Sequence, residues 1–320
     1  MFVDRERELA FLQQTWNSGR AELVVVYGRR RVGKTALLRT FSQQHPHTFW
    51  VASLSSEAIL RQSFTDALWQ TNHPAQPSAG FIYESWERAF GALADLAASQ
   101  RHCVVIDEFP YLAGSEPSVP SVLQKVWDER LQHTNVMLVL CGSHIGMMER
   151  QTLDYQAPLY GRRTGQMQLH PLPLHASAGL LPLHDPVDQI ETYAVLGGIA
   201  TYWSQFDAQS SLLANIEQRI LNPASYLYQE PLFLLREELQ EPRNYFAILQ
   251  AIAQGLPTVL TDAHGHEAFA DLGYRVSAEM EKAGYDEIDY QESDEHIAEL
   301  LEANEFNDYY RFNRKGEHIG

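Results

Sequence analysis

The sequence predicts an α/β fold built on a parallel β-sheet. Short apolar runs rich in Val, Ile and Leu alternate along the first half of the chain with segments whose apolar residues recur at helical spacing. The runs are apolar along most of their length, as in parallel strands that helices cover on both faces. The chain has 320 residues, 45% of them hydrophobic, which allows two or three domains. The expected strands are 22–27, 48–53, 102–107 and 136–141.

Helices are expected before, between and after these strands. In the first of them, Leu9, Leu12 and Trp16 recur on one face. Beyond about Pro171 the strand-like runs stop, and residues 187–255 have helical patterns interrupted by glycines and prolines, which predicts a separate helical domain. The expected helices of the first half are 5–17, 35–44, 56–70, 82–99 and 119–131.

The charge of the chain is strongly negative and unevenly spread. The formal net charge is −17, and residues 257–320 hold 16 acidic and 5 basic residues, a net of −11. Such a chain is a poor general binder of nucleic acid, because contacts with phosphates dominate that affinity. In the acidic segment, residues 277–284 and 293–303 are expected to be helical, and 309–312 to be a short strand.

The two cysteines and the hydropathy bound the class of protein. Cys103 opens one expected strand and Cys141 closes another, so they would lie roughly 13–17 Å apart in neighbouring strands. That is too far for a disulfide, and both are expected to be core residues. No apolar run approaches the roughly 20 residues that span a bilayer. The first residues lack the apolar region of a signal peptide. A soluble, cytoplasmic protein is therefore expected.

A phosphate-binding loop follows the first expected strand. It fits the pattern G-x-x-x-x-G-K-S/T, between a strand and a helix as the pattern requires. The glycines let the backbone N–H groups surround phosphates, and the start of the helix adds its positive dipole end. Lys34 is expected to reach the β- and γ-phosphates of a nucleotide, and Thr35 to bind Mg²⁺. The predicted nucleotide contacts are Gly28, Arg29, Arg30, Arg31, Val32, Gly33, Lys34, Thr35 and Ala36.

Two carboxylates end the third expected strand. The run Cys-Val-Val-Ile leads into Asp107 and Glu108, which is the Walker B pattern. Asp107 is expected to bind Mg²⁺ at the carboxyl end of the sheet, and Glu108 to activate the attacking water as a general base. The alternative, a strand that ends in solvated carboxylates, is common for such a sequence taken alone.

Three further residues are candidates for the reaction. Ser143 follows the fourth expected strand, where it would sense the γ-phosphate or position water, or cap the next helix, or do both. Arg162 and Arg163 lie in a Gly–Arg turn and would supply an arginine to the γ-phosphate, within the chain or in a neighbouring subunit. The alternative for this pair is solvation or pairing with local acidic residues. His264 and His266 lack a third ligand and are expected to be surface residues.

Five segments together resemble a known family. They are FVDRERELAFL, VVVYGRRRVGKTALL, VVIDEFPYL, LVLCGSHIGMMER and APLYGRRTGQMQLHPL. They are similar to the archaeal-type ATPases of the STAND branch of AAA-like P-loop NTPases. The resemblance covers roughly residues 1–200 and weakens through about 255.

The resemblance implies a parallel sheet of strand order 5-1-4-3-2, a helical lid and a small winged-helix-like C-terminal domain. The implied boundaries are 1–171 for the core, 172–242 for the lid and 243–320 for the C-terminal domain with its acidic end. Phe2, Val3 and Arg5 would lie near the adenine. The lid motif Gly-Gly-x-Pro reads Gly197-Gly198-Ile199-Ala200 here, so Gly198 would help to hold the nucleotide although the proline is missing. Residues 245–255 resemble the first helix of the winged helix.

Two functions of different classes fit these residues. The first is an ATPase switch that binds ATP with Mg²⁺, hydrolyses it and regulates or assembles with a protein or nucleic acid, with nucleotide-dependent homo-oligomers as one form of assembly. The second is a regulator or scaffold that binds nucleotide without hydrolysing it. Glu108 favours the first, since a base beside the metal ligand favours hydrolysis. A small-molecule kinase is a weaker third, because no acceptor site is evident.

Overall fold

The fold is described from a computed structural model, which describes residues 3–73, 80–155, 157–181, 185–238 and 246. The chain divides into two compact units, Met1–Tyr228 and Gln229–Gly320, and each is described by itself. In the second unit the described residues are Gln229, the helix α12 (Glu230–Glu238) and Phe246. Several predictions concern residues that the structure does not describe. They concern Phe2, the winged-helix segment 245–255 apart from Phe246, the pair His264 and His266, and the elements expected within 277–312.

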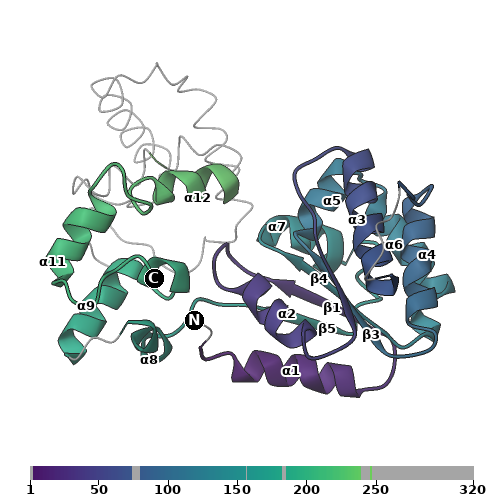
Figure 1. Cartoon of the computed structure of the whole chain (residues 1–320), viewed down its shortest axis with the longest axis horizontal. Helices are drawn as coiled ribbons and strands as arrows, with labels where there is room; N and C mark the ends of the chain where they lie inside the picture. Colours follow the sequence, from purple (N-terminus) through teal and green to yellow (C-terminus); the bar gives the residue numbers. More distant parts are fainter. Residues whose placement is uncertain (1–2, 74–79, 156, 182–184, 239–245, 247–320) are drawn as a thin grey trace, which may run out of the picture. The chain divides into compact units, whose positions relative to one another are not determined.

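The first unit is organised around a five-stranded parallel sheet of order β2-β3-β4-β1-β5 (Figure 1). This is the order 5-1-4-3-2 that the family resemblance implies, so that prediction is confirmed. The four strands expected from the hydropathy pattern are all present, with ends shifted by at most two residues. The strands are β1 (Glu22–Tyr27), β2 (His47–Val51), β3 (His102–Asp107), β4 (Val136–Gly142) and β5 (Gly165–Gln168).

Helices cover both faces of the sheet, because successive side chains of each strand point to opposite faces. Leu23 and Val25 of β1 belong to one hydrophobic core, and Val24 and Val26 to the other. Helices α1 (Glu6–Asn17) and α2 (Lys34–Ser42) pack on the second of these cores. The core that contains Leu23 and Val25 is covered by four helices. These are α3 (Glu57–Asn72), α4 (Trp86–Leu96), α5 (Phe109–Ser115) and α6 (Val119–Glu129). The two cysteines are free and fully buried, as expected.

The hydropathy pattern alone does not reveal α5 or β5. Helix α5 begins directly after Glu108 and has only seven residues, too few for a clear period. The sequence of β5, Gly-Gln-Met-Gln, is largely polar because β5 is an edge strand that pairs with β1 on one side. Between β4 and β5 the chain forms the short helix α7 (Ile145–Met148), followed by a π-helical turn, Glu149–Leu153.

After β5 the first unit continues as a small helical region, as expected from the helical patterns that follow Pro171 in the sequence. Its own core is formed by five buried side chains, Leu181, Leu196, Trp203, Phe206 and Leu227. The helices are α8 (Leu174–Ser177), α9 (Pro186–Leu196), α10 (Ala200–Trp203) and α11 (Leu212–Asn215), with a π-helical segment Ile216–Ile220. None of the helices in the described part of the chain is long and apolar enough to cross a membrane.

Gly198 lets this helical region approach the chain that leaves the sheet. Its carbonyl oxygen accepts a 2.8 Å hydrogen bond from the N–H of Leu172. A Cβ at position 198 would lie only 1.9 Å from the carbonyl oxygen of Leu172, which no side chain tolerates. Beside it, Trp203 donates its indole N–H to the carbonyl of Gly197 at 2.7 Å. The glycine pair therefore has a packing role in this structure.

Histidines gather at the amino end of the sheet. His102 is almost fully buried, and its Nε2 lies 3.0 Å from the hydroxyl of Thr48, which also hydrogen-bonds the hydroxyl of Thr71. Burial, with a smaller contribution from His47, lowers the pKa of His102 from 6.5 to about 4. His45 nearby stacks on Trp16, and its pKa is also lowered, by burial and then by the charge of Arg101. His102 is therefore neutral in the folded state near neutral pH.

We expect Gly198→Ala to destabilise the first unit by roughly 1–3 kcal/mol, because the new Cβ collides with rigid backbone. Denaturant unfolding followed by tryptophan fluorescence measures the change. Gly179→Ala is the matched control, since a Cβ at position 179 meets nothing within 4 Å. Equal stabilities of the two variants would contradict the close approach.

Because of His102, we expect the free energy of unfolding to fall by on the order of 2 kcal/mol between pH 6.5 and pH 4. The pKa of His102 is lowered in the folded state but not in the unfolded state, so protonation at acidic pH favours unfolding. The contribution is fully present above pH 6.5 and is lost as pH falls toward 4. His102→Gln keeps a polar group beside Thr48 but does not titrate there. Its unfolding free energy, measured in urea across this range, is expected to depend less on pH than that of the wild type; parallel profiles would refute the assignment.

Candidate functional site

The phosphate loop joins β1 to α2 in the conformation that the glycines predict. Gly28 has φ 151°, and a Cβ there would lie 2.3 Å from the carbonyl oxygen of Leu169, which follows β5. Gly33, with φ 99°, precedes the first residue of α2. Only glycine readily accepts both the close approach and the left-handed backbone. The loop therefore ends at the positively polarised start of a helix, where anions bind favourably.

Lys34 lies buried beneath the loop. Its Nζ donates to the carbonyl oxygens of Gly28 at 2.7 Å and Arg29 at 2.8 Å. Burial lowers the pKa of Lys34, while the nearby carboxylates of Glu108 and Asp107 act in the opposite direction. The phosphate oxygens of a nucleotide are stronger acceptors for an ammonium group than these neutral carbonyls. Lys34 is therefore placed to bind phosphates in the loop.

Thr35 and Asp107 meet across the loop. The Thr35 hydroxyl donates a 2.6 Å hydrogen bond to Oδ2 of Asp107, whose side chain is almost fully buried. The second oxygen, Oδ1, accepts the backbone N–H of Glu108 at 3.0 Å. Both predicted metal ligands thus present oxygen atoms at one point. Cys141 of the neighbouring strand β4 borders the same point, where burial and the Asp107 carboxylate raise the pKa of its thiol.

Glu108 and Ser143 form a second pair beside the first. The Ser143 hydroxyl donates to Oε1 of Glu108 at 2.7 Å, and the Ser143 N–H lies 3.4 Å from Oε2. The residue that caps α7 is His144, so the Ser143 side chain serves Glu108 rather than the helix. This hydrogen bond fixes the direction of the carboxylate.

Among the residues that the structure describes, left-handed backbone at non-glycine positions occurs close to this site. In the described part of the chain, the residues with positive φ other than glycine are Asp4 at 50°, Arg31 at 65° and Glu108 at 54°. Each such residue costs on the order of 1–2 kcal/mol. Backbone strain of this kind clusters at functional sites, where the surrounding structure holds it in place.

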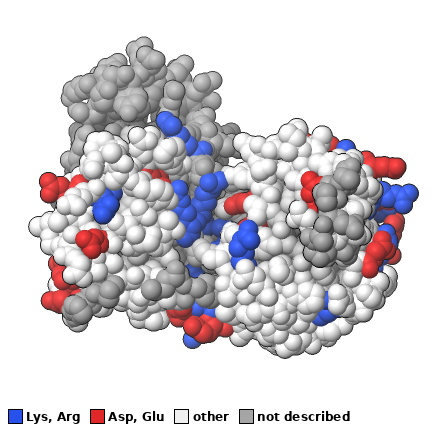
Figure 2. Space-filling view, in the orientation of Figure 1, with Lys and Arg blue, Asp and Glu red and all other residues white. Residues whose placement is uncertain are grey.

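The arginines of the loop contact different elements. Arg30 donates through Nη2 to the hydroxyl of Tyr111 in α5. The guanidinium of Arg31 lies over the ring of Tyr226, 4.8 Å from its centroid. Sequence reasoning assigned no role to either tyrosine, because both lie far from the loop in the chain; Tyr111 is part of the segment VVIDEFPYL but has no role in the motif there. Figure 2 shows Lys and Arg side chains gathered near the start of α2, while acidic side chains on this face lie mostly toward its rim.

Arg162 and Arg163 are engaged elsewhere in this structure. Arg162 makes a bidentate contact with Asp128 of α6, with Nη2 2.9 Å from Oδ2 and Nε 3.1 Å from Oδ1. Arg163 donates to the carbonyls of Thr152 and Leu153 and lies over the ring of Tyr160. These contacts match the alternative in which the pair binds local groups. Their role toward the γ-phosphate stays a prediction.

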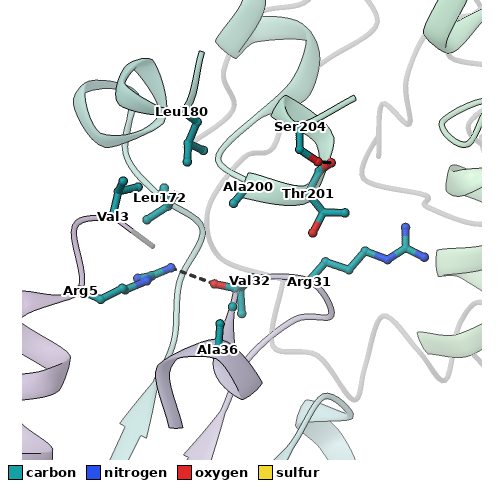
Figure 3. Close-up of a pocket in the computed structure, with 11 residues that line it drawn as sticks. Val3, Arg5, Arg31, Val32, Ala36, Leu172, Leu180, Ala200, Thr201 and Ser204 are labelled. Atoms are coloured by element: carbon teal, nitrogen blue, oxygen red, sulfur yellow. Dashed lines mark hydrogen bonds between the residues drawn. The ribbon is translucent and has the colours of Figure 1, made fainter. Parts of the chain in front are cut away.

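A pocket of about 270 Å³ opens beside the loop (Figure 3). Its walls come from the N-terminal segment, the start of α2, the exit from β5 and helix α10. The size is close to the roughly 300 Å³ at the lower end of small-molecule sites. It is lined by Val3, Arg5, Arg31, Val32, Gly33, Ala36, Leu172, Leu180, Ala200, Thr201 and Ser204.

The predicted residues Val3, Arg5 and Ala36 lie in this pocket, and Arg5 also has a structural part. Its Nη2 donates to the carbonyls of Val32 at 3.0 Å and His170 at 2.8 Å, and its Nη1 pairs with Glu8 at 2.8 Å. Arg5 therefore ties the N-terminal segment to the phosphate loop and to the exit from β5.

Sequence reasoning missed the walls that α10 and the segment after β5 contribute. Thr201 lies on α10 and Ser204 directly follows this helix, and Figure 3 shows Thr201 directed toward the loop. Leu172 and Leu180 supply apolar wall. The one available signal was the Gly197-Gly198 pair just before α10. Gly198 is not among the lining residues; its close contact is with Leu172.

Among the described residues, no group of three or more His, Cys, Asp or Glu side chains is arranged to hold a metal ion. Thr35 and Asp107 are the predicted oxygen ligands at the loop, and their side chains meet there. This is compatible with Mg²⁺, which usually takes one or two protein ligands together with phosphates and water.

Several known proteins are similar to this chain. An uncharacterized protein of Methanocaldococcus jannaschii is 32% identical over 259 residues, which is 81% of this chain and 56% of the relative. The chain thus spans about half the length of that relative. An uncharacterized ATP-binding protein of the same organism is 56% identical over 41 residues, 13% of this chain and 70% of the relative.

Solved structures share the fold. A Walker-type ATPase of Pyrococcus abyssi has 22% identity and a TM-score of 0.59, covering 94% of this chain and 89% of its own. The ORC2 protein of Aeropyrum pernix, in ADPNP–ADP complexes, has 15% identity and a TM-score of 0.60, covering 93% and 85%.

The family model for an ATPase domain found predominantly in Archaea matches residues 2–202, well over half of the chain. The match includes the phosphate loop, both carboxylates, Ser143 and both arginines before β5. The chain belongs to this family of P-loop ATPase domains.

Proposed function

We propose that this protein hydrolyses ATP with Mg²⁺ and that the nucleotide it holds switches the position of its helical lid. The observation that carries the proposal is the convergence of Lys34, Asp107 and Glu108 at one edge of the sheet. A phosphate-binding cation, a metal ligand and a general base are the groups that phosphoryl transfer to water requires.

Mg²⁺ fits the oxygen atoms at the loop. We assign Thr35 and Asp107 to hold it, Thr35 directly and Asp107 directly or through water, because hard oxygen ligands suit this ion. When bound, Mg²⁺ would neutralise charge on the β- and γ-phosphates.

In the reaction the groups of the chain act on water and on the phosphates. Glu108, oriented by Ser143, accepts a proton from the attacking water. The water oxygen forms a bond to the γ-phosphorus while the bond from that phosphorus to the bridging oxygen breaks, and ADP leaves with the electron pair. Lys34 and the N–H groups of the loop stabilise the charge on the phosphate oxygens.

The nucleoside would occupy the pocket beside the loop. Val3, Leu172 and Leu180 offer an apolar wall for the base, and Thr201 and Ser204 offer hydroxyls. Since α10 belongs to the proposed lid and forms part of this wall, a nucleotide bound there would contact the lid. The contact between Arg31 and Tyr226 is a second link from the loop to the lid.

We infer the domain boundaries 1–171 for the core, 172–242 for the lid and 243–320 for the C-terminal domain, which we take to be winged-helix-like at its start. The switch role and the STAND and AAA assignments rest on the family resemblance. They support a protein that acts with a protein or nucleic-acid partner and forms homo-oligomers with nucleotide. We infer a cytoplasmic location from the hydropathy and the two cysteines. A regulator that binds nucleotide without turnover is the second candidate, favoured by the alanine at position 200 of the lid motif.

We expect Lys34→Ala to weaken ATP binding on the order of 100-fold or more, because it removes the charge that meets the phosphates. Isothermal titration calorimetry with the non-hydrolysed analogue AMP-PNP measures this. Lys125→Ala is the control, since Lys125 lies on the surface and pairs with Glu87. Unchanged affinity in Lys34→Ala would refute the phosphate-binding role.

We expect Glu108→Gln to keep ATP affinity while turnover falls by roughly 10²–10⁴, the usual contribution of a general base. Release of free phosphate from ATP is the measurement, with the exposed Glu87→Gln as control. Turnover equal to wild type would mean that Glu108 is not the base. A wild type that binds ATP tightly without turnover would instead support the regulator.

A further inference from the structure

Arg30 connects the phosphate loop to the helix that carries the general base. Its guanidinium donates to the hydroxyl of Tyr111, in the first turn of α5. The backbone N–H of Tyr111 in turn donates to the carbonyl of Glu108 at 2.9 Å. Glu108 is the N-cap residue of α5. The Arg30 side chain is therefore directed from the loop toward the side of the site where Glu108 lies.

Lys34 is a common neighbour of these two groups. The charges of Arg30 and Glu108 both act on the Lys34 ammonium, Arg30 in the opposite sense to Glu108. Lys34 itself is held by the carbonyls of Gly28 and Arg29, directly next to Arg30 in the loop. Arg30 and Glu108 thus both lie within electrostatic range of Lys34, which is expected to reach the β- and γ-phosphates, so this is the region expected for the end of a polyphosphate chain.

A guanidinium suits that region chemically. The transition state of phosphoryl transfer spreads negative charge over the three equatorial oxygens of the γ-phosphate, and a further cation there raises kcat. The planar fork of N–H donors matches phosphate oxygens better than the point charge of an ammonium group. The bond to Tyr111 restrains the long side chain, which reduces the entropy lost when it binds a phosphate.

The other two candidate arginines bind groups outside the phosphate loop. Arg162 would have to give up its bidentate ion pair with Asp128. Arg163 would have to leave two backbone carbonyls and the ring of Tyr160. Arg30 already belongs to the loop that wraps the phosphates, and Tyr111 holds it on the side of the site where Glu108 lies.

We propose that Arg30 binds the γ-phosphate within the same chain and stabilises its charge during hydrolysis, with Tyr111 as the residue that positions it. This inference rests on the proposed ATPase function. It places the arginine that contacts the γ-phosphate in the phosphate loop, whereas the sequence predicted it at Arg162 or Arg163. ADP lacks the phosphate that Arg30 contacts, so Arg30 also distinguishes ATP from ADP.

The test compares affinities for AMP-PNP and ADP, measured by calorimetry with Mg²⁺, and turnover of ATP. The variants are Arg30→Ala, Arg30→Lys, Tyr111→Phe and the double variant Arg30→Ala/Tyr111→Phe. Arg88→Ala is the control, an exposed arginine on α4. Arg162→Ala and Arg163→Ala are measured alongside.

For Arg30→Ala we expect AMP-PNP to bind about tenfold more weakly, ADP affinity to change by less than about twofold, and turnover to fall on the order of 100-fold. Arg30→Lys is expected to recover part of both losses. Tyr111→Phe is expected to lower turnover less than Arg30→Ala does, and to have no further effect when Arg30 is already alanine. A residue that only supports the fold would not show this dependence.

An equal loss of AMP-PNP and ADP affinity in both Arg30→Ala and Arg30→Lys would overturn the proposal, since it would mean that Arg30 only shapes the loop. So would unchanged turnover, or the expected pattern appearing in Arg162→Ala or Arg163→Ala instead. If the wild type shows no turnover, the hydrolysis proposal fails by itself. The ratio of AMP-PNP to ADP affinity then still decides whether Arg30 binds the terminal phosphate.

Discussion

The site depends on the alignment of the carboxyl ends of the three central strands, β3, β4 and β1. In the parallel register, Tyr27 of β1 lies opposite Gly142 of β4, and Ile106 of β3 opposite Leu140 of the same strand. The segments that follow β1, β3 and β4 therefore leave the sheet at one edge. A slip of one residue between these strands would turn the inward side chains to the other face. Because both faces of these strands are buried, the hydrophobic cores fix the register and, with it, the position of the site.

Hydrogen bonds between neighbouring segments then fix the polar side chains at this edge. Asp107 is held by Thr35, and Glu108 by Ser143. Each bond joins the end of one strand to the segment after another, so no single element forms the site. Such mutual support keeps polar groups at the geometry that charge stabilisation in a transition state requires. It also offsets the strained backbone at Glu108, which the start of α5 imposes.

The sequence predicts those parts of the fold and site that depend on local patterns. The phosphate loop and the Asp107–Glu108 pair are visible because glycine spacing and an apolar strand are local features. The contacts between Arg30 and Tyr111, and the wall made by Thr201, depend on tertiary packing that no periodicity records. Strand β5 escapes the pattern because an edge strand needs fewer apolar residues. Family resemblance supplied its place in the sheet.

The three consecutive arginines of the loop form a local basic patch in the sequence. The structure distributes them: Arg30 contacts α5, and Arg31 reaches across to Tyr226 of the helical region. Arg31 accepts a left-handed backbone, which glycine would adopt without strain. An arginine at such a position is best explained by what its side chain reaches. A loop that closes around phosphates thus has separate connections to the helix behind the general base and to the lid. These connections are the physical means by which the proposed switch would transmit the presence of a γ-phosphate.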